Sequence, residues 1–398
     1  MKDSNNLPTT GKQRYVILDA LRGFALLGIA LANFPEFGLW TFLNAEQQAA
    51  MPTAEVDRWV HFAQYMLIDG KFYTIFSLLF GVGFSMILIK HGRKLFIRRM
   101  LILMVIGLLH RLFIWSGDIL VVYATGGLIL TLFVKLPDKA LLGLAVGLIL
   151  LPVGLDALIE FHGIEYAKRP YMDWWRKANE LGINEDNFAT WLRDAKSYSE
   201  MFAFLMQGTI ERSWELLSGH RLPKVVGLFI IGYLIGKRRL YARIEELPLK
   251  EMLSCFLLLS LVLSYGYALS ATNNHPWGKT IHSLLYAVSV IPLGFCYIFI
   301  LSLLYKKHPK AVSFRLLAAS GRMALTNYIG QSVVGVVLFY GIGFGLGLRL
   351  GLWQIELVAL DTFLVQIALS ILWLRWFRFG PLEWVWRMLT YGRWLPLR

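Results

Sequence analysis

The sequence has little charge and little cysteine. Charged residues make up 17% of its 398 residues, whereas hydrophobic residues make up 57% and the mean hydropathy is +0.54. A soluble chain of this length could not bury so much apolar surface, so we expect a polytopic protein embedded in a lipid bilayer rather than a soluble enzyme domain. The two cysteines, Cys255 and Cys296, lie within apolar runs, which favours small core residues over a disulfide.

Other absences narrow the function. No metal-ligand spacing accompanies the histidines, so no metal is expected. No small-residue cleavage site follows the first apolar run, so we expect that run to remain as a membrane anchor. The net charge of +14 could indicate nucleic-acid binding, but the basic residues lie between apolar runs rather than on one polar face. We therefore expect no nucleic-acid partner.

Ten apolar runs predict membrane-spanning helices in an all-α integral membrane protein with a single polytopic domain. They cover residues 18–40, 72–89, 96–115, 118–136, 141–159, 222–236, 252–271, 281–305, 323–348 and 357–377. Residues 1–14 form a polar tail, residues 160–221 form the one long polar segment, and residues 378–398 form a basic, aromatic tail. The pattern of Trp and Arg in that last tail predicts an interfacial helix.

Lysine and arginine are distributed unevenly among the connections. With the N-terminus taken as cytoplasmic, the inner segments hold 25 of these residues and the short outer connections hold 5. Because cytoplasmic loops of membrane proteins carry an excess of Lys and Arg, we predict that both ends face the cytoplasm. Residues 160–221 are then predicted to lie on the outer side.

The first apolar run carries polar groups that need an interior partner. Asp19 and Arg22 are three residues apart and so share one face of a helix. Asn33 follows ten residues that have no charge and no side-chain hydrogen-bonding group, Gly23 to Ala32. Polar groups at such depth cost a few kcal/mol unless they face a partner or a cavity. We therefore expect this helix to face the interior of the bundle.

Further basic residues are predicted to join Asp19 and Arg22 at the cytoplasmic ends of other helices. Arg322 and Asn327 begin the ninth predicted helix, and Arg98–Arg99 begin the third. Together they would form a basic pocket suited to a phosphorylated ligand such as a coenzyme. The alternative is that Arg98, Arg99 and Arg322 only anchor their helices at the cytoplasmic face.

A second polar cluster is predicted near the outer face. Asp69 and Lys71 precede the second predicted helix, His110 and Arg111 end the third, and Asp118 begins the fourth. A histidine beside a carboxylate can act as a general base, and His110 with Asp118 is the best such pair. The alternative is a structural polar network, in which Asp118 caps its helix and Arg111 neutralises it.

Four stretches resemble a known family. They are the LDALRG motif from Leu18, the GKFYTIFSLLFGVG motif from Gly70, GLLHR from Gly107 with GDIL from Gly117, and GRMALTNY from Gly321 with FGPLEW from Phe379. Over nearly its whole length the chain resembles the YeiB-like bacterial membrane family, also called domain of unknown function 418. The resemblance implies a multi-pass protein of the bacterial inner membrane.

The family is grouped with transmembrane acyltransferases, which take an acyl group from cytoplasmic acyl-CoA and deliver it across the membrane to a glycan. The resemblance therefore implies acyl-CoA as co-substrate and a fold like that of those enzymes. In the O-acyltransferases a histidine follows the arginine of the first helix, and the matching position here is Asn33. His110 would then supply the base, assisted by Asp118, while Asn33 donates a hydrogen bond to the developing oxyanion.

Two hypotheses of different classes follow. In the first, the protein transfers an acyl group to an envelope glycan or to a small hydroxyl or amine acceptor. Asp19, Arg22 and Arg322 then shape the coenzyme entry, and Trp residues in 160–221 hold a sugar by stacking. In the second, the protein is a transporter or exporter without covalent chemistry, and the same polar groups line a substrate path. Both hypotheses are compatible with a homodimer.

Overall fold

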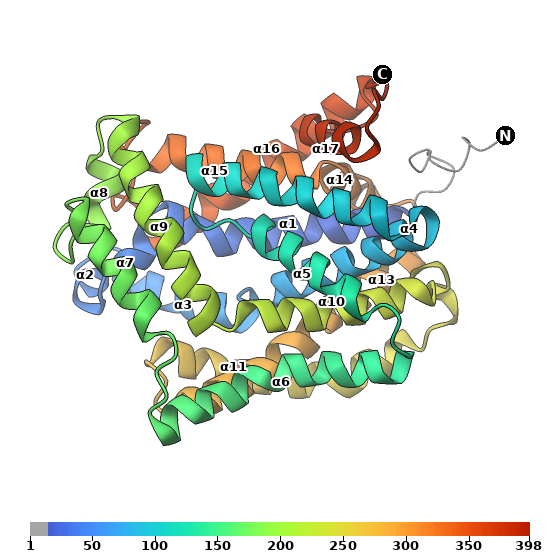
Figure 1. The fold of residues 1–398 in the computed structure, drawn as a ribbon, viewed down its shortest axis with the longest axis horizontal. Helices are drawn as coiled ribbons and strands as arrows, with labels where there is room; N and C mark the ends of the chain where they lie inside the picture. Colours follow the sequence, from blue (N-terminus) through green and yellow to red (C-terminus); the bar gives the residue numbers. More distant parts are fainter. Residues whose placement is uncertain (1–14) are drawn as a thin grey trace.

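The computed structural model describes residues 15–398, and every regular element in that range is helical (Figure 1). The polar tail predicted over residues 1–14 lies outside the described residues. Within residues 15–398, six helical stretches are long and apolar enough to cross a membrane: Val16–Phe37, Ala54–Phe113, Asp138–His162, Leu249–Thr272, Lys279–Lys307 and Leu352–Trp376. The chain is therefore a helical membrane protein, as its composition predicts.

The α-helices follow in chain order. They are α1 (Val16–Phe37), α2 (Ala45–Ala49), α3 (Ala54–Leu67), α4 (Lys71–Phe113), α5 (Leu120–Phe133), α6 (Asp138–His162), α7 (Lys168–Glu180), α8 (Phe188–Asp194), α9 (Tyr198–Ser218), α10 (Arg221–Lys237), α11 (Leu249–Thr272), α12 (Lys279–Leu285), α13 (Ile291–Lys307), α14 (Val312–Arg322), α15 (Ala324–Phe339), α16 (Leu352–Trp376) and α17 (Pro381–Tyr391). A π-helical turn, Tyr286–Val290, joins α12 to α13.

All ten predicted apolar runs contain helix, but their lengths differ from the prediction. The helices α5, α10 and α15 have 14, 17 and 16 residues, so they fall short of the six candidate spans. The run predicted over 323–348 ends at Phe339, because a glycine-rich turn follows in which Gly345 has a φ of +61°. The number of spans and their alternation across the membrane therefore stay predictions.

Two predicted helices belong to one element, α4. The chain between them was expected to be a loop, yet the only break is at Gly92, whose φ of 77° and ψ of 174° are non-helical. Because glycine has no Cβ, it adopts this conformation without steric cost. Tyr73 and Gly117 lie at one cavity of the molecule and His91 at another, so the chain reverses direction at Gly92.

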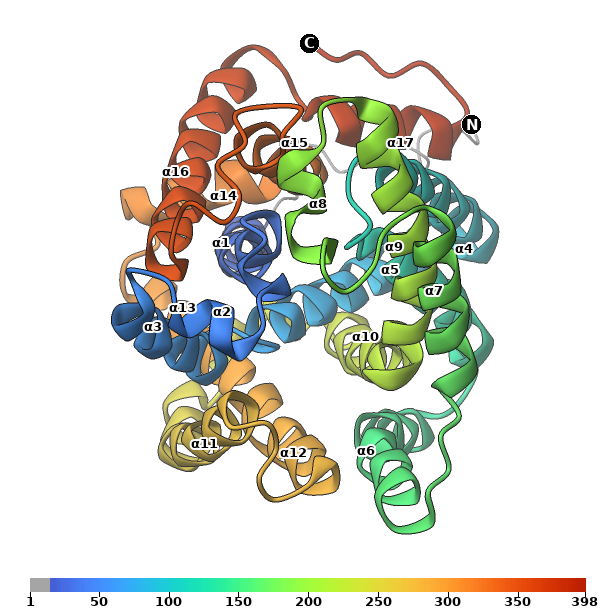
Figure 2. The same cartoon turned by 90° about the vertical axis from the view of Figure 1, so that its left-hand side faces the viewer.

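The helix α1 lies at the centre of the bundle, and α14 crosses it closely (Figure 2). A Cβ atom built on Gly23 would lie 2.0 Å from the carbonyl oxygen of Leu317, and one on Gly321 would lie 1.9 Å from that of Asp19. Only glycine permits this approach of two backbones, which is the packing that small residues provide between membrane helices.

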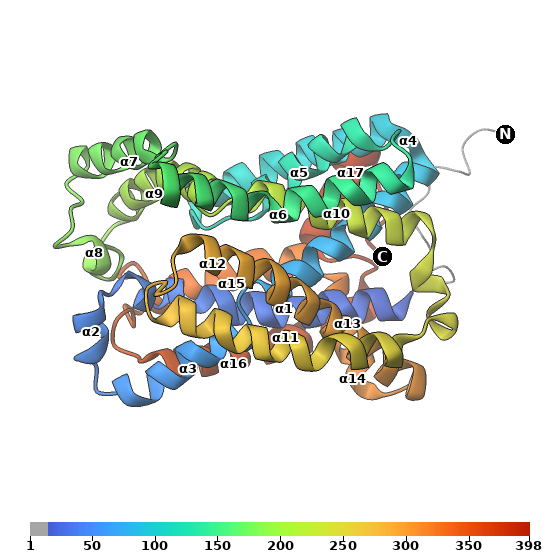
Figure 3. The ribbon, with the colours of Figure 1, turned by 90° about the horizontal axis from the view of Figure 1, so that it is seen from below.

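The two ends of the bundle differ. We call the end that holds the start of α1 and α17 the inner end, and the end that holds α7, α8 and α9 the outer end (Figures 1 and 3). The segment predicted as long and polar, residues 160–221, thus contains α7, α8 and α9 and lies at the opposite end from α17. The predicted orientation, in which those two regions face opposite sides of the membrane, stays a prediction.

Candidate functional site

Two cavities enter the bundle from its two ends. The outer cavity, about 1050 Å³, lies at the outer end among α1, α4, α6, α9, α10, α11, α12 and α15. The inner cavity, about 280 Å³, lies at the inner end among α1, α4, α5, α14, α15 and α17. Three side chains, Ile29, Ile119 and Tyr328, line both cavities. We call these three residues the junction.

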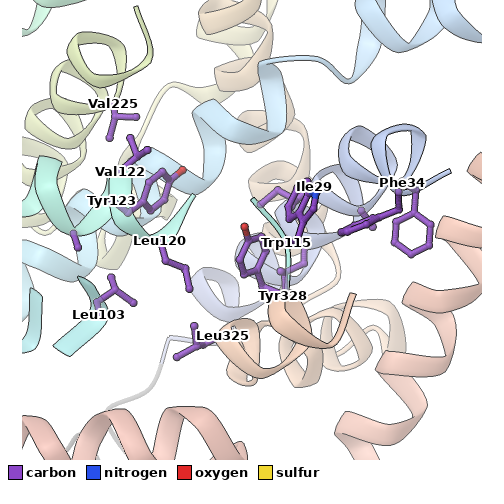
Figure 4. Packing of buried hydrophobic residues seen from close by; sticks show 14 of the residues in the cluster. Ile29, Phe34, Leu103, Trp115, Leu120, Val122, Tyr123, Val225, Leu325 and Tyr328 are labelled. Atoms are coloured by element: carbon purple, nitrogen blue, oxygen red, sulfur yellow. The ribbon is translucent and has the colours of Figure 1, made fainter. Parts of the chain in front are cut away.

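The junction belongs to the largest hydrophobic cluster of the protein. Ile29 and Tyr328 are buried in it together with Trp115, and Figure 4 shows the three in one part of the core. The hydroxyl oxygen of Tyr328 accepts a hydrogen bond of 3.1 Å from the backbone N–H of Ile119. The tyrosine is therefore fixed at the point where the two cavities meet.

The inner cavity contains most of the predicted basic cluster. Arg22 donates to Asp19 at 2.8 Å, and both residues line the cavity with Arg322. Arg99 also lines it, and its guanidinium lies 3.6 Å from the ring centroid of Trp386 in α17. The tail predicted to be interfacial thus forms one wall of the cavity, which the sequence did not indicate.

A carboxylate holds that wall in place. Glu383 of α17 accepts hydrogen bonds from the backbone N–H groups of Leu325 and Thr326 at 2.6 and 3.1 Å, and from the Thr326 hydroxyl at 2.6 Å. It therefore satisfies free donors at the start of α15. Burial raises the pKa of Glu383 above its ordinary value.

Asn327 does not belong to this cavity. Its side-chain amide donates to the carbonyl oxygen of Ser320 at 3.1 Å and to the hydroxyl of Ser370 at 3.0 Å, and the residue is buried. It lines neither of the two cavities. It links α14, α15 and α16, and its role in ligand binding stays a prediction. Arg98 likewise does not line the inner cavity.

His110 and Asp118 form the predicted pair. The distance from His110 Nδ1 to Asp118 Oδ1 is 2.9 Å, and His110 Nε2 lies 2.9 Å from the hydroxyl of Ser332. The other Asp118 oxygen accepts the N–H of Val121 at 2.8 Å, as the capping alternative predicts. His110, Asp118 and Ser332 are each at most 2% exposed, and they line neither cavity.

The predicted base is thus separated from the space where a substrate fits. The ring of Tyr328 lies 5.4 Å, centroid to centroid, from that of His110 and faces both cavities. Both His110 nitrogens already have partners, so the arrangement satisfies a buried polar network. A catalytic role for His110 stays a prediction, and the geometry favours the structural alternative.

Two further predicted binding residues have structural partners. Arg111 lies outside both cavities and donates to the backbone oxygen of Thr209 at 2.6 Å, which ties α4 to α9. Lys71 is fully buried and donates to the backbone oxygen of Tyr65 at 2.6 Å. A role of Arg111 and Lys71 in ligand binding stays a prediction, and these contacts favour a structural role.

Asp69 and Asn33 do line the outer cavity. Asp69 accepts a hydrogen bond of 2.6 Å from the hydroxyl of Tyr267. Within residues 15–398 the Asn33 side chain has no hydrogen bond, so its amide is available to a ligand. Glu36, one turn further along α1, accepts from Trp115 Nε1 at 3.0 Å and pairs with Arg212 at 3.1 Å.

Carboxyl groups surround Arg212 of α9, which lines the outer cavity. Glu211 lies next to Arg212 and near Glu215, which pairs with that arginine. Burial raises the pKa of Glu211 to about 8, and the charge of Glu215 adds to the shift. Glu211 is therefore largely protonated at neutral pH.

Several residues of the outer cavity were not identified from sequence. Arg221 and Lys224 at the start of α10 line it, as do Tyr73, Tyr286 and His282. One available signal was that two basic residues lie on the predicted outer side of a short apolar run, against the usual charge bias. The tyrosines carried no such signal, because an aromatic residue in an apolar helix is normally a core residue.

This geometry defines a class: a polytopic helical membrane protein with a polar cavity at each end. Comparison with known proteins then shows the family. Residues 235–393 match the family "Protein of unknown function (DUF418)". The chain belongs to this YeiB-like family.

Three relatives match over nearly the full chain. The uncharacterized 39.9 kDa protein in the amylase 3' region of Bacillus acidopullulyticus is 32% identical over 98% of this chain and 97% of its own length. Uncharacterized protein YeiB of Escherichia coli is 29% identical over 95% and 96%, and uncharacterized protein YxaH of Bacillus subtilis is 28% identical over 98% and 97%. No solved structure matches the chain. The predicted family is thus confirmed, and the relatives' names state no activity.

Proposed function

We propose that the protein transfers an acyl group from acyl-CoA in the inner cavity to an acceptor in the outer cavity. The observation that carries this proposal is that the two cavities enter from opposite ends and share the junction residues Ile29, Ile119 and Tyr328. Two substrates that enter from opposite sides of the bacterial inner membrane could react only where those spaces meet.

The inner cavity suits the coenzyme in charge and in size. Arg22, Arg99, Arg322 and Arg387 line it, and guanidinium groups bind phosphate oxygens with two parallel hydrogen bonds. Its 280 Å³ is below the range of about 300–1,000 Å³ typical of a whole ligand site. We therefore infer that it holds the acyl-pantetheine arm, with the nucleotide phosphates at the basic mouth.

The reaction would be a direct transfer. The acceptor oxygen or nitrogen attacks the thioester carbonyl, the carbon–sulfur bond breaks, and CoA leaves as the thiol. Asn33 faces the outer cavity with a free amide and could donate to the developing oxyanion. In this scheme a group at the outer cavity accepts the acceptor's proton.

Among the histidines that line the outer cavity, only His282 has one ring nitrogen in a hydrogen bond and the other without a partner in residues 15–398. It lines the outer cavity, and its Nδ1 lies 3.0 Å from the hydroxyl of Ser270. Its Nε2 has no hydrogen bond within residues 15–398, whereas both nitrogens of His110 and of His220 have partners. We therefore propose His282 in place of His110 as the general base.

The test is binding of acetyl-CoA to the purified full-length protein, measured by calorimetry. Arg99→Gln removes a cavity cation, and Arg98→Gln makes the same change at the adjacent exposed residue outside the cavity. We expect wild type and Arg98→Gln to bind with equal affinity and Arg99→Gln to lose about tenfold or more. Equal binding by both variants at unchanged melting temperature would contradict the coenzyme site.

The same preparation separates transfer from transport. A transferase releases free CoA when an acceptor is present, whereas a transporter moves its substrate unchanged across a sealed vesicle. No binding of acetyl-CoA, longer acyl-CoA or free CoA by the wild type would exclude the transferase and leave the transporter alternative.

A further inference from the structure

We propose that Arg221 and Lys224 bind a phosphate group on the ligand of the outer cavity, so that the acceptor is a phosphorylated polyol. This inference rests on the proposed function only in taking that ligand to be the acceptor. The site itself follows from the side chains that line the cavity and from the partners they have or lack.

The two cations share one face of α10. Arg221 is the first residue of the helix and Lys224 lies one turn later, so both side chains project from the same face, and both line the outer cavity. Within residues 15–398 neither forms an ion pair or a hydrogen bond. The Lys224 ammonium instead lies 4.2 Å from the ring centroid of Tyr286, a cation–π contact that leaves its N–H groups available.

The carboxylates of the same cavity are already engaged elsewhere. Glu36 pairs with Arg212 at 3.1 Å and Asp156 with His220 at 3.0 Å. Asp69 accepts the Tyr267 hydroxyl at 2.6 Å. Arg221 and Lys224 therefore have no ion-pair partner in the described part of the chain. Arg221 is exposed, whereas Lys224 is partly buried, where an unpaired cation is costly. A bound anion would remove that cost.

Neutral donors lie in the same cavity. The hydroxyl of Tyr73 is buried without a hydrogen-bond partner, and it belongs to a side chain that lines the cavity. The cations come from the first turn of α10, where free backbone N–H groups and the helix dipole also favour an anion. A fork-shaped guanidinium, an ammonium and a hydroxyl donor match the several oxygens of a phosphate group.

Aromatic rings in the same cavity would contact the part of the ligand that carries the phosphate. Tyr171 and Trp214 line the outer cavity, with ring centroids 5.3 Å apart, and Trp214 is stacked on Trp174 at 5.3 Å. A rigid aromatic wall suits the apolar face of a sugar ring. The shared chemistry is thus a phosphate on a polyol, which either a soluble sugar phosphate or a lipid headgroup could present.

The experiment measures binding to the full-length protein in detergent without acyl-CoA. The soluble probes are glucose 1-phosphate and glucose, which differ only by the phosphate. The lipid probes are dioctanoyl phosphatidylglycerol and dioctanoylglycerol. The variants are Arg221→Gln and Lys224→Gln, and the matched control is Lys168→Gln, since Lys168 lines the same cavity but pairs with Glu165 at 3.0 Å.

We expect one phosphorylated probe to bind and its neutral counterpart not to bind, which also identifies the source of the phosphate. Affinity should fall by about tenfold or more in Arg221→Gln and in Lys224→Gln, and stay unchanged in Lys168→Gln. The proposal is overturned if neither phosphorylated probe binds, if the neutral probe binds equally well, or if all three variants behave alike. Because no acyl-CoA is present, these outcomes are independent of whether the protein is a transferase.

Discussion

The inner and outer cavities are built in different ways. The inner cavity is small and arranged around the ion pair of Asp19 and Arg22, which are neighbours in sequence. The outer cavity is larger and draws its charged and aromatic groups from helices spread from α1 to α15. Two of its cations that form no ion pair among the described residues, Arg221 and Lys224, come from a helix that no motif singled out. A sequence motif can therefore locate a site that is built around one helix, but it cannot locate a site whose residues come from many helices.

The largest expected effect tests whether His282 or His110 acts as the general base. His282→Gln should lower acyl transfer by about a hundredfold or more, because a general base typically contributes that much. The melting temperature should change less than in the His110 variant, since the ring loses one hydrogen bond, to Ser270, and its contacts with the rings of Tyr267 and His275. His110→Gln should instead lower the melting temperature, because Asp118 and Ser332 lose their buried partner. For each variant, acyl transfer is measured as release of CoA, and stability is measured by thermal unfolding. A His110→Gln protein that melts normally but releases no CoA would return the base to His110.

A second prediction concerns a substitution that should disrupt the inner cavity and leave the outer cavity intact. Gly321→Ala puts a methyl group 1.9 Å from the Asp19 carbonyl oxygen, so α1 and α14 must separate. We expect a cost of about 1–3 kcal/mol in stability, together with weaker acetyl-CoA binding. Gly147→Ala is the control, because its methyl group meets nothing within 4 Å. That variant should be as stable as the wild type or slightly more stable. Equal thermal unfolding of the two variants would contradict the close crossing.

The smallest effect concerns Glu211, the residue before the cavity-lining Arg212 in α9. Burial raises the pKa of Glu211 to about 8, so the folded state favours the protonated, neutral carboxyl group over the charged one. Its favourable contribution is fully present below the unfolded pKa of about 4.3 and is lost as the pH rises through about 8. Glu211→Gln should therefore melt higher than the wild type at pH 8, with the difference shrinking toward pH 5. A difference that is constant with pH would show that Glu211 does not titrate in this range.

Much of the fold could be predicted from sequence, because apolar runs report helices directly. The lengths could not, since the end of α15 at Phe339 depends on a turn and α4 continues through the expected loop except at Gly92. In the inner cavity, Asp19, Arg22 and Arg322 were predicted because they lie near the same predicted membrane face. Asn327 shares that depth, but it projects toward Ser320 and Ser370. Depth alone does not fix which side of a helix a residue faces.

The outer cluster shows the same limit. His110 and Asp118 are eight residues apart across a tight turn, so their contact could be predicted. Ser332 is 222 residues from His110, and nothing in the sequence links the two. Because Ser332 and Tyr328 both lie against His110, the histidine belongs to a buried polar network and does not face a cavity. Long-range contacts of this kind decide whether a side chain reaches a cavity, and they leave no local pattern in the sequence.

The most direct test of the account is whether the two cavities open to opposite sides of the membrane. In a background with Cys255→Ser and Cys296→Ser, Gly83→Cys places a thiol in the inner cavity and Ala32→Cys places one in the outer cavity. Gly147→Cys, on the exposed face of α6, is the lipid-facing control. Each variant is treated in sealed vesicles with a membrane-impermeant thiol reagent from one side at a time. We expect labelling of Gly83→Cys only from the cytoplasmic side, of Ala32→Cys only from the outer side, and of Gly147→Cys from neither. Labelling of both cavity thiols from the same side would contradict this expectation.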